Sequence, residues 1–295
     1  YEIRDRDEAV SIMVDKANIA ADTIKNNYDC WVAYYDGHLL EISIEQRRLL
    51  GEFEPALQND EFVMYLQPQV KRDGAAKGAE AVRWVHPSRG ILTPYAFIDI
   101  LENAGLIYKL DLYIWEKAAQ KLAEWKEKGY GSYHISVNIS TKDFYIIDIY
   151  ETFTGLINKY GIAASNLHLE ITETTLMTDF EKNMNIIHKL QGVGFRVEID
   201  DFGSGYSSLN MLKDISADVL KIDMGFLRKS ENEVKGQDIL ESITLAGKIG
   251  MDVITEGVET KKQLDMLTMM GCHEFQGYYF SKPVPVSEFE EKYLV

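Results

Sequence analysis

From residue 59 onward, short apolar segments alternate with longer amphipathic ones. Segments of the first kind are typical of strands, and we predict eight of them: residues 62–70, 78–84, 133–140, 167–172, 195–200, 217–222, 251–256 and 273–278. Residues 109–129 show the second kind, with Leu110, Ile114, Ala118, Leu122 and Trp125 on one helical stripe. Eight strands that alternate with helices predict an α/β fold, a TIM-like (β/α)8 barrel.

One connection departs from this scheme. The first two strands are linked only by KRDGAAK, residues 71–77, which contains an Asp-Gly pair and has no room for a helix. So short a link favours a hairpin. We therefore expect a barrel whose first strand is antiparallel to the second.

Residues 1–38 do not follow the barrel pattern. They predict one helix, with Val10, Val14, Ala17 and Ala21 on one face, and a short strand at CWVAYY, residues 30–35. One helix and one strand cannot close a core, so we expect the tail of a preceding domain. Residues 39–58 predict a connecting helix, and residues 59–295 the barrel domain.

Composition and charge narrow the class of protein. The chain of 295 residues is 46% hydrophobic, enough for an ordinary core, and has no run of about 18 apolar residues that would span a membrane. Its net charge of −16 argues against binding a nucleic-acid duplex. Cys30 and Cys272 are isolated, which suits a reducing compartment. We expect a cytoplasmic protein, or the cytoplasmic part of a longer membrane-associated one.

Polar residues recur where six consecutive predicted strands end. They are Asn138, Glu170, Asp200 with Asp201, Lys221, Glu256 and Gln276. Any one of them has an ordinary explanation, such as capping a turn. Because active sites of such barrels lie at the carboxyl ends of the strands, the set predicts one converging site.

The residue types in this set indicate metal chemistry. Several carboxylates around one cavity repel each other unless cations neutralise them. Oxygen ligands without cysteine suit Mg²⁺ or Mn²⁺. Asp200 and Asp201 could serve neighbouring ions, as in two-metal phosphodiester hydrolysis, and Lys221 could orient the attacking water or offset developing charge.

Seven motifs, taken in order, resemble one family. GAEAVRWVHPSRG, SVNIS, LEITET, DDFGSGYSSL, LKID, EGVET and QGYYFSKPVP resemble the EAL-domain cyclic di-GMP phosphodiesterases over about residues 59–290. Residues 1–38 resemble the end of a GGDEF domain without its signature loop. The resemblance implies bacterial second-messenger signalling, hydrolysis of cyclic di-GMP to linear pGpG with two Mg²⁺ or Mn²⁺ ions, and upstream regulatory domains; a homodimer is left open.

The same resemblance assigns roles to individual residues. It implies that the metal ligands are Glu80, Asn138, Glu170, Asp200 and Asp201. The catalytic set that it implies is Lys221, which assists the water, Glu256 and Gln276 beside it, and Glu173, which holds the DDFGSG loop. It also implies that Gln67 and Arg83 contact the substrate, Arg83 at a phosphate, and that Asp223 supports the residues around them.

One motif departs from the family pattern E-A-L-x-R-W. Here it is EAVRW, so Glu80 and Arg83 are three residues apart rather than four, and a regular strand puts them on opposite faces. We expect the strand to keep Glu80 inward and to adjust between Val82 and Trp84. Alternatively the strand slides, Arg83 keeps its place and Ala79 takes the metal position. The shortened motif also leaves open a non-catalytic cyclic di-GMP receptor or regulatory module.

Overall fold

The computed structural model describes residues 7–25, 30–71, 76–202, 215–223 and 243–294, without the side chains of residues 77 and 79–83. Its helices are α1 (Val10–Asp22), α2 (Gly37–Gln58), α3 (Ile98–Ala104), α4 (Ile107–Glu127), α5 (Asp143–Ile146), α6 (Ile149–Tyr160), α7 (Glu173–Thr178), α8 (Phe180–Val193), α11 (Lys261–Met269) and α12 (Val286–Tyr293), with 3₁₀ turns η1 (Pro94–Ala96) and η2 (Ala164–Asn166). Its strands are β1 (Phe62–Lys71), β2 (Ala76–His86), β3 (Gly90–Leu92), β4 (Ile135–Ile139), β5 (Leu167–Thr172), β6 (Val197–Phe202), β7 (Val219–Asp223), β8 (Asp252–Glu256), β9 (Glu274–Phe275) and β10 (Val284–Pro285).

The eight predicted strands are β1, β2 and β4 to β9, and they form the wall of the expected barrel. Their hydrogen-bonded order is β3-β2-β1-β9-β8-β7-β6-β5-β4, and β10 joins β1. Strand β1 is antiparallel to both β2 and β9, whereas β4 to β9 are parallel to each other. The TIM-like fold and its reversed first strand are therefore confirmed.

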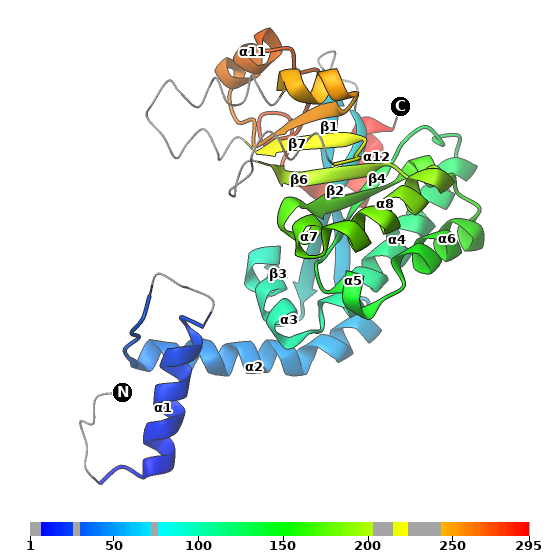
Figure 1. Cartoon of the computed structure of the whole chain (residues 1–295). Helices are drawn as coiled ribbons and strands as arrows, with labels where there is room; N and C mark the ends of the chain where they lie inside the picture. The colour runs from blue at the N-terminus through cyan, green and yellow to red at the C-terminus, as the bar shows by residue number, and fades with distance from the viewer. Residues whose placement is uncertain (1–6, 26–29, 72–75, 203–214, 224–242, 295) are drawn as a thin grey trace.

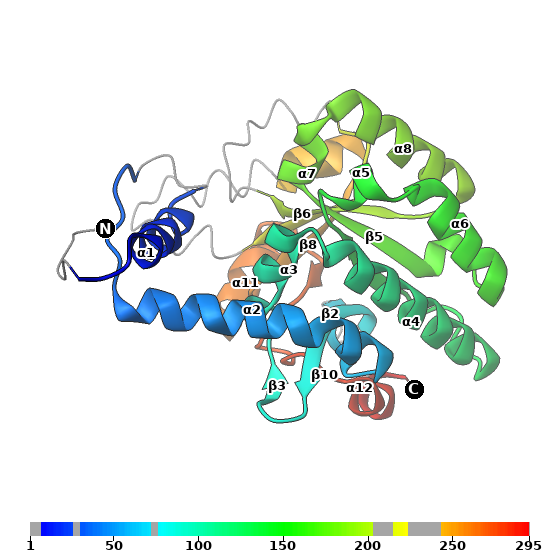
Figure 2. The same cartoon turned by 90° about the horizontal axis from the view of Figure 1, so that it is seen from below.

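Alternation along the parallel strands separates the two faces of the barrel wall. In β5, Leu167, Leu169 and Ile171 are fully buried and belong to the main apolar core with helix residues such as Phe153 and Leu190. The residues between them are polar. Because a strand repeats every two residues, these polar residues share the opposite, interior face. The helices α4, α6 and α8 cover the outside of this wall (Figure 2).

Helix α4 also fixes the mouth end of β4. Trp115 is fully buried and donates its indole Nε1–H to the carbonyl oxygen of Asn138, 2.9 Å away. Its ring packs on Phe153 of α6, with 4.5 Å between the ring centroids. This contact holds the end of β4, where a predicted site residue lies, against the helical layer.

A second, smaller core joins α2 to the start of the barrel. Leu49 and Phe53 of α2 pack with Phe62 of β1 and Trp84 of β2, and the Trp84 indole donates to Glu61 at 3.0 Å. The beginning of α2 extends away from the barrel, with α1 beside it (Figure 1). Among the described helices, none combines the length and apolarity needed to cross a bilayer.

The prediction of a strand at CWVAYY is wrong. Residues 30–36 have no regular secondary structure, and Trp31 is 88% exposed. The run of aromatic and β-branched residues favours a strand locally, but pairing needs a neighbouring strand, and the described part of this segment lies beside helices α1 and α2 (Figure 1).

Candidate active site

Lys221 lies at the centre of a cluster of carboxylates at the mouth of the barrel. Its Nζ is 2.8 Å from Glu170 Oε1, 2.9 Å from Glu256 Oε1 and 3.2 Å from Asp200 Oδ1. Four neighbouring parallel strands, β5 to β8, supply these residues. Glu170 and Lys221 are fully buried, whereas Asp200 and Glu256 reach solvent. The ammonium group therefore offsets the mutual repulsion of three carboxylates.

Asp200, Asp201 and Glu256 form a set with the geometry of a cation site. One carboxylate oxygen from each lies within 4.8 Å of the others. Asp201 is exposed and has φ of 54°, a left-handed conformation that non-glycine residues rarely adopt. This backbone turn allows two successive aspartates of one strand to face the same site, although strand alternation would separate them.

Gln276 and Gln67 connect the last and first strands at the mouth. Gln276 donates from Nε2 to Gln67 Oε1 at 3.3 Å, and Gln67 donates to the Ser281 carbonyl at 3.0 Å. Gln276 Oε1 is buried and has no hydrogen-bond partner among the described residues. A buried amide oxygen of this kind is available to a water, a cation or a substrate donor.

The remaining predicted residues lie at the same end of the barrel. Asn138 is the exposed, second-to-last residue of β4 and is paired in register with Glu170, and Asp223 is paired with Glu256. Glu173 begins α7, directly after Thr172, whose side chain caps that helix. The DDFGSG loop that Glu173 is expected to hold, residues 200–205, lies outside the described residues from residue 203 onward.

The backbone of β2 shows where the shortened motif is accommodated. Glu80 is paired with Gln67 and Arg83 with Val63, and the register shifts between these pairs. Two residues of β1, Tyr65 and Leu66, lie opposite the single residue Ala81, which is a β-bulge in β1. We expected the adjustment between Val82 and Trp84; that position is wrong, because pairing is regular there.

A cavity of about 500 Å³ opens beside the mouth, between β4 and helices α3 and α4. It extends from Asn138 and Gln276 to Asp111, along a largely apolar wall. Burial raises the pKa of Asp111 well above its usual range, and the adjacent Asp143 carboxyl raises it further. The buried Asp111 Oδ2 and Asp143 Oδ1 have no hydrogen-bond partner among the described residues, and a proton held between the two carboxyls would satisfy both.

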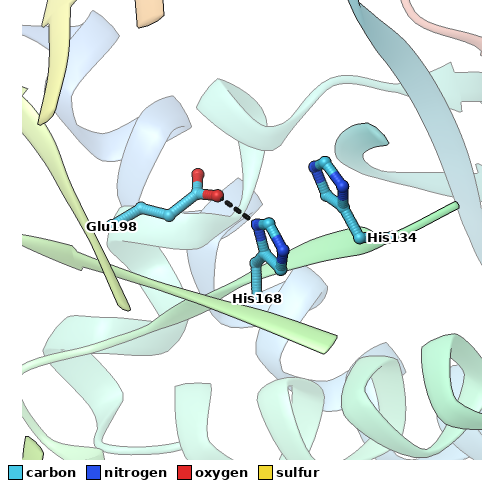
Figure 3. Close-up of side chains that lie close together, drawn as sticks. All are labelled: His134, His168 and Glu198. Carbon is cyan, nitrogen blue, oxygen red and sulfur yellow. Dashed lines mark hydrogen bonds and ion pairs between the residues drawn. The ribbon is translucent and has the colours of Figure 1, made fainter. Parts of the chain in front are cut away.

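Sequence reasoning missed a second polar layer inside the barrel. His134 precedes β4, His168 lies in β5 and Glu198 in β6, and His168 Nδ1 is 2.6 Å from Glu198 Oε1 (Figure 3). Burial opposes ionisation of Glu198, but the hydrogen bond and charge of His168, helped by Lys221, hold its pKa at about 2. A signal existed: His168 and Glu198 stand two residues before Glu170 and Asp200, hence on the same strand face.

The fold and the mouth together define a TIM-like barrel with an acidic, lysine-centred site that could bind metal. The chain belongs to the EAL domain family, which matches residues 51–283. It is 32% identical over 272 residues to the bifunctional diguanylate cyclase/cyclic di-GMP phosphodiesterase MucR of Pseudomonas aeruginosa, which covers 91% of this chain. It is 33% identical over 240 residues, 81% of this chain, to the cyclic di-GMP phosphodiesterase PdeR of Escherichia coli.

Solved structures agree with this assignment. The PaMucR phosphodiesterase in complex with c-di-GMP has a TM-score of 0.78 at 32% identity, over 82% of this chain and 99% of that one. An EAL domain protein from Listeria monocytogenes has a TM-score of 0.69 at 29% identity, over 83% of this chain and 97% of that one. The chain spans 39% of the full length of MucR and 36% of PdeR.

Proposed function

We propose that this chain hydrolyses cyclic di-GMP to linear pGpG with the help of Mg²⁺ or Mn²⁺. The observation that carries the proposal is the meeting of Asp200, Asp201 and Glu256 oxygens within 4.8 Å of one another beside the buried Lys221. We take cyclic di-GMP as the substrate because the relatives MucR and PdeR are named for action on it.

The residues that would hold the ions are Glu80, Asn138, Glu170, Asp200 and Asp201. Their carboxylate and amide oxygens suit hard divalent cations. Bound there, two such ions would supply Lewis acidity and an activated water. Support for Glu80 comes from the backbone: a Cβ on Gly78 would point at His134 inside the barrel, and a strand repeats its face every two residues.

Other residues would position the reactants. The ammonium group of Lys221, held by carboxylates on three strands, would orient the attacking water and offset charge that develops on the phosphate. Glu256 and Gln276 would hold that water from either side. We assign Gln67 and Arg83 to the substrate. The last two proposed roles are those of Asp223, which would support the metal ligands, and Glu173, which would hold the loop after β6.

Product formation tests this proposal. The protein is incubated with cyclic di-GMP and Mn²⁺, and pGpG is separated by chromatography. We expect pGpG from the wild type, and none from the Asp200→Asn/Asp201→Asn variant or after chelation of the metal. Exposed Asp265→Asn serves as the control and should leave turnover unchanged. Tight binding of cyclic di-GMP without pGpG would contradict catalysis.

The second candidate is a cyclic di-GMP receptor that does not hydrolyse its ligand. The β-bulge in β1 supports it, since it shifts the pairing of β2, the strand that carries Glu80. Against it, the carboxylates on the other strands and Lys221 are all present at the mouth. The same incubation distinguishes the two candidates, because a receptor binds cyclic di-GMP and leaves it intact.

We also propose that residues 1–38 derive from a GGDEF domain. Support comes from α1, where Val10 is 73% and Val14 51% exposed, so that an apolar helix face lies uncovered. A partner domain or a second copy of the chain would cover this face. Sedimentation of the chain with and without residues 1–38 tests whether this face mediates association.

A further inference from the structure

Two histidines and a glutamate meet inside the barrel, one layer below the mouth. They come from the amino-terminal ends of three neighbouring parallel strands, β4, β5 and β6 (Figure 3). One potential ligand atom from each of His134, His168 and Glu198 lies within 4.8 Å of the others. The interior of such a barrel is ordinarily filled by branched apolar side chains, so this polar cluster needs an explanation.

The hydrogen bonds of the cluster leave one group unsatisfied. Glu198 is fully buried and its Oε1 pairs with His168 Nδ1, but its Oε2 has no hydrogen-bond partner among the described residues. Leaving a buried carboxylate oxygen unpaired costs free energy, and such atoms are rare in native proteins. The hydrogen bond to His168 uses only one of the two carboxylate oxygens, so Oε2 is available as a ligand for a cation.

We propose that His134, His168 and Glu198 form a second metal site, of the transition-metal class, and that Zn²⁺ is the ion it fits. Two imidazoles and one carboxylate are a known protein ligand set for zinc, with the fourth position left open. Imidazole nitrogen favours zinc, copper and nickel over magnesium. The site is thus chemically distinct from the oxygen-rich mouth, where Glu170 and Asp200 lie two residues further along the same strands.

Binding requires that the cluster rearranges: an imidazole ring must turn, and the hydrogen bond between His168 Nδ1 and Glu198 must give way to the metal. The two imidazole rings are stacked, with centroids 3.7 Å apart and planes 5° from parallel. A metal lies in the plane of each imidazole that binds it, so one ring must rotate. Ligand atoms around tetrahedral zinc are about 3.3 Å apart, from Zn–N distances of about 2.0 Å. The three ligand atoms, which now lie within 4.8 Å of one another, must adopt this spacing.

His134 is the least buried member of the cluster. His134 directly precedes β4 and is only half-buried. Its Nε2 is 2.9 Å from Oε1 of the buried Gln69, which could instead support the bound imidazole as an outer hydrogen-bond partner. The facing residue of β2 is Gly78, whose missing side chain leaves the space that the His134 ring occupies.

Cobalt titration of a protein with a disabled mouth tests the proposal. In the Asp200→Asn/Asp201→Asn background, we expect one equivalent of Co²⁺ to bind with the strong visible absorption of a four-coordinate site, and Zn²⁺ to displace it. Substituting His134→Gln or His168→Gln in that background should weaken Co²⁺ binding at least tenfold. Exposed His188→Gln is the matched control and should bind as the parent does.

A folding defect is separated from a ligand defect by far-UV circular dichroism and thermal unfolding of each variant. If His168→Gln does not fold, the Co²⁺ affinity of His134→Gln tests the site instead. Pulsed EPR of the Cu²⁺-loaded parent gives a second test, in which we expect couplings from imidazole nitrogens. Absence of bound Co²⁺ in the parent, or equal binding by the His134→Gln and His188→Gln variants, would overturn the proposal. Because the readout is metal binding, its failure is independent of whether the wild type produces pGpG.

Discussion

Lys221 and Glu170 form an ion pair of 2.8 Å in which neither side chain is in contact with solvent. A buried pair of this kind contributes little net stability, because removing two charges from water costs about as much as their attraction returns. Here the lysine serves three carboxylates on three strands, since it also reaches Asp200 and Glu256. The cluster therefore contributes little net stability, which fits a site built for chemistry.

Replacing Lys221 by methionine should reduce both stability and turnover. The change leaves Glu170 as a buried charge without its cation, a loss of about 3–5 kcal/mol in the free energy of unfolding. The rate of pGpG formation should fall about 10²- to 10³-fold, as when one preorganised charge stabiliser is removed. Urea unfolding and product chromatography measure the two effects. Exposed Lys262→Met should change neither, and a fully active Lys221→Met enzyme would contradict the assigned role.

Glu80 and Arg83 should respond differently to substitution. Glu80 is paired with Gln67 in a register that supports an interior position, so Glu80→Gln should weaken Mn²⁺ binding at least about tenfold, the least that changes around metal ligands usually cost. Arg83→Ala should leave Mn²⁺ affinity as it is and raise KM for cyclic di-GMP. Titration of Mn²⁺ followed by EPR measures the first effect. Unchanged Mn²⁺ affinity in Glu80→Gln would show that another residue of β2 takes the metal position.

Most of the barrel could be predicted from the sequence because its signals are local. Strand alternation and helical stripes depend on neighbours two to four residues away, and the short link after β1 admits only a hairpin. The polar strand ends, such as Glu170 and Glu256, followed from the fold alone. Parallel strands bring their carboxyl ends to one mouth, wherever they stand in the sequence.

The features that could not be predicted depend on distant parts of the chain. The position of the bulge is one example: Tyr65 and Leu66, the two residues opposite Ala81, also pair with β10, more than 200 residues later. The Asp111–Asp143 pair is another, because nothing in the local sequence signals that two carboxyls 32 positions apart lie next to each other. Missing the layer of His168 and Glu198 was avoidable, since they share a strand face with the predicted ligands.

Gly78 of β2 should not tolerate a side chain. A Cβ there would lie 1.9 Å from His134 Nε2, so Gly78→Ala must displace the imidazole and with it the contact between β2 and β4. We expect a loss of about 1–3 kcal/mol in the free energy of unfolding, typical of overpacking. Gly51→Ala in α2, where a Cβ meets nothing within 4 Å, should instead raise it by about 0.5–1 kcal/mol. Chemical denaturation of both variants tests the contrast.

The Asp111–Asp143 pair predicts how stability depends on pH. Burial and the neighbouring carboxyl raise the pKa of Asp111 in the folded state above its value in the unfolded chain. Its contribution to stability is therefore fully present below the unfolded pKa and is lost as pH rises through the folded pKa. Asp111→Asn cannot titrate, and its amide can donate to Asp143 in place of the shared proton. The free energy of unfolding of Asp111→Asn should rise relative to that of the wild type from acidic to neutral pH, as measured by urea unfolding at a series of pH values.

Exposed Asp15→Asn is the control and should follow the wild-type pH profile of stability. If Asp111→Asn also followed the wild-type profile, Asp111 would be ionised in the folded protein, which contradicts the prediction.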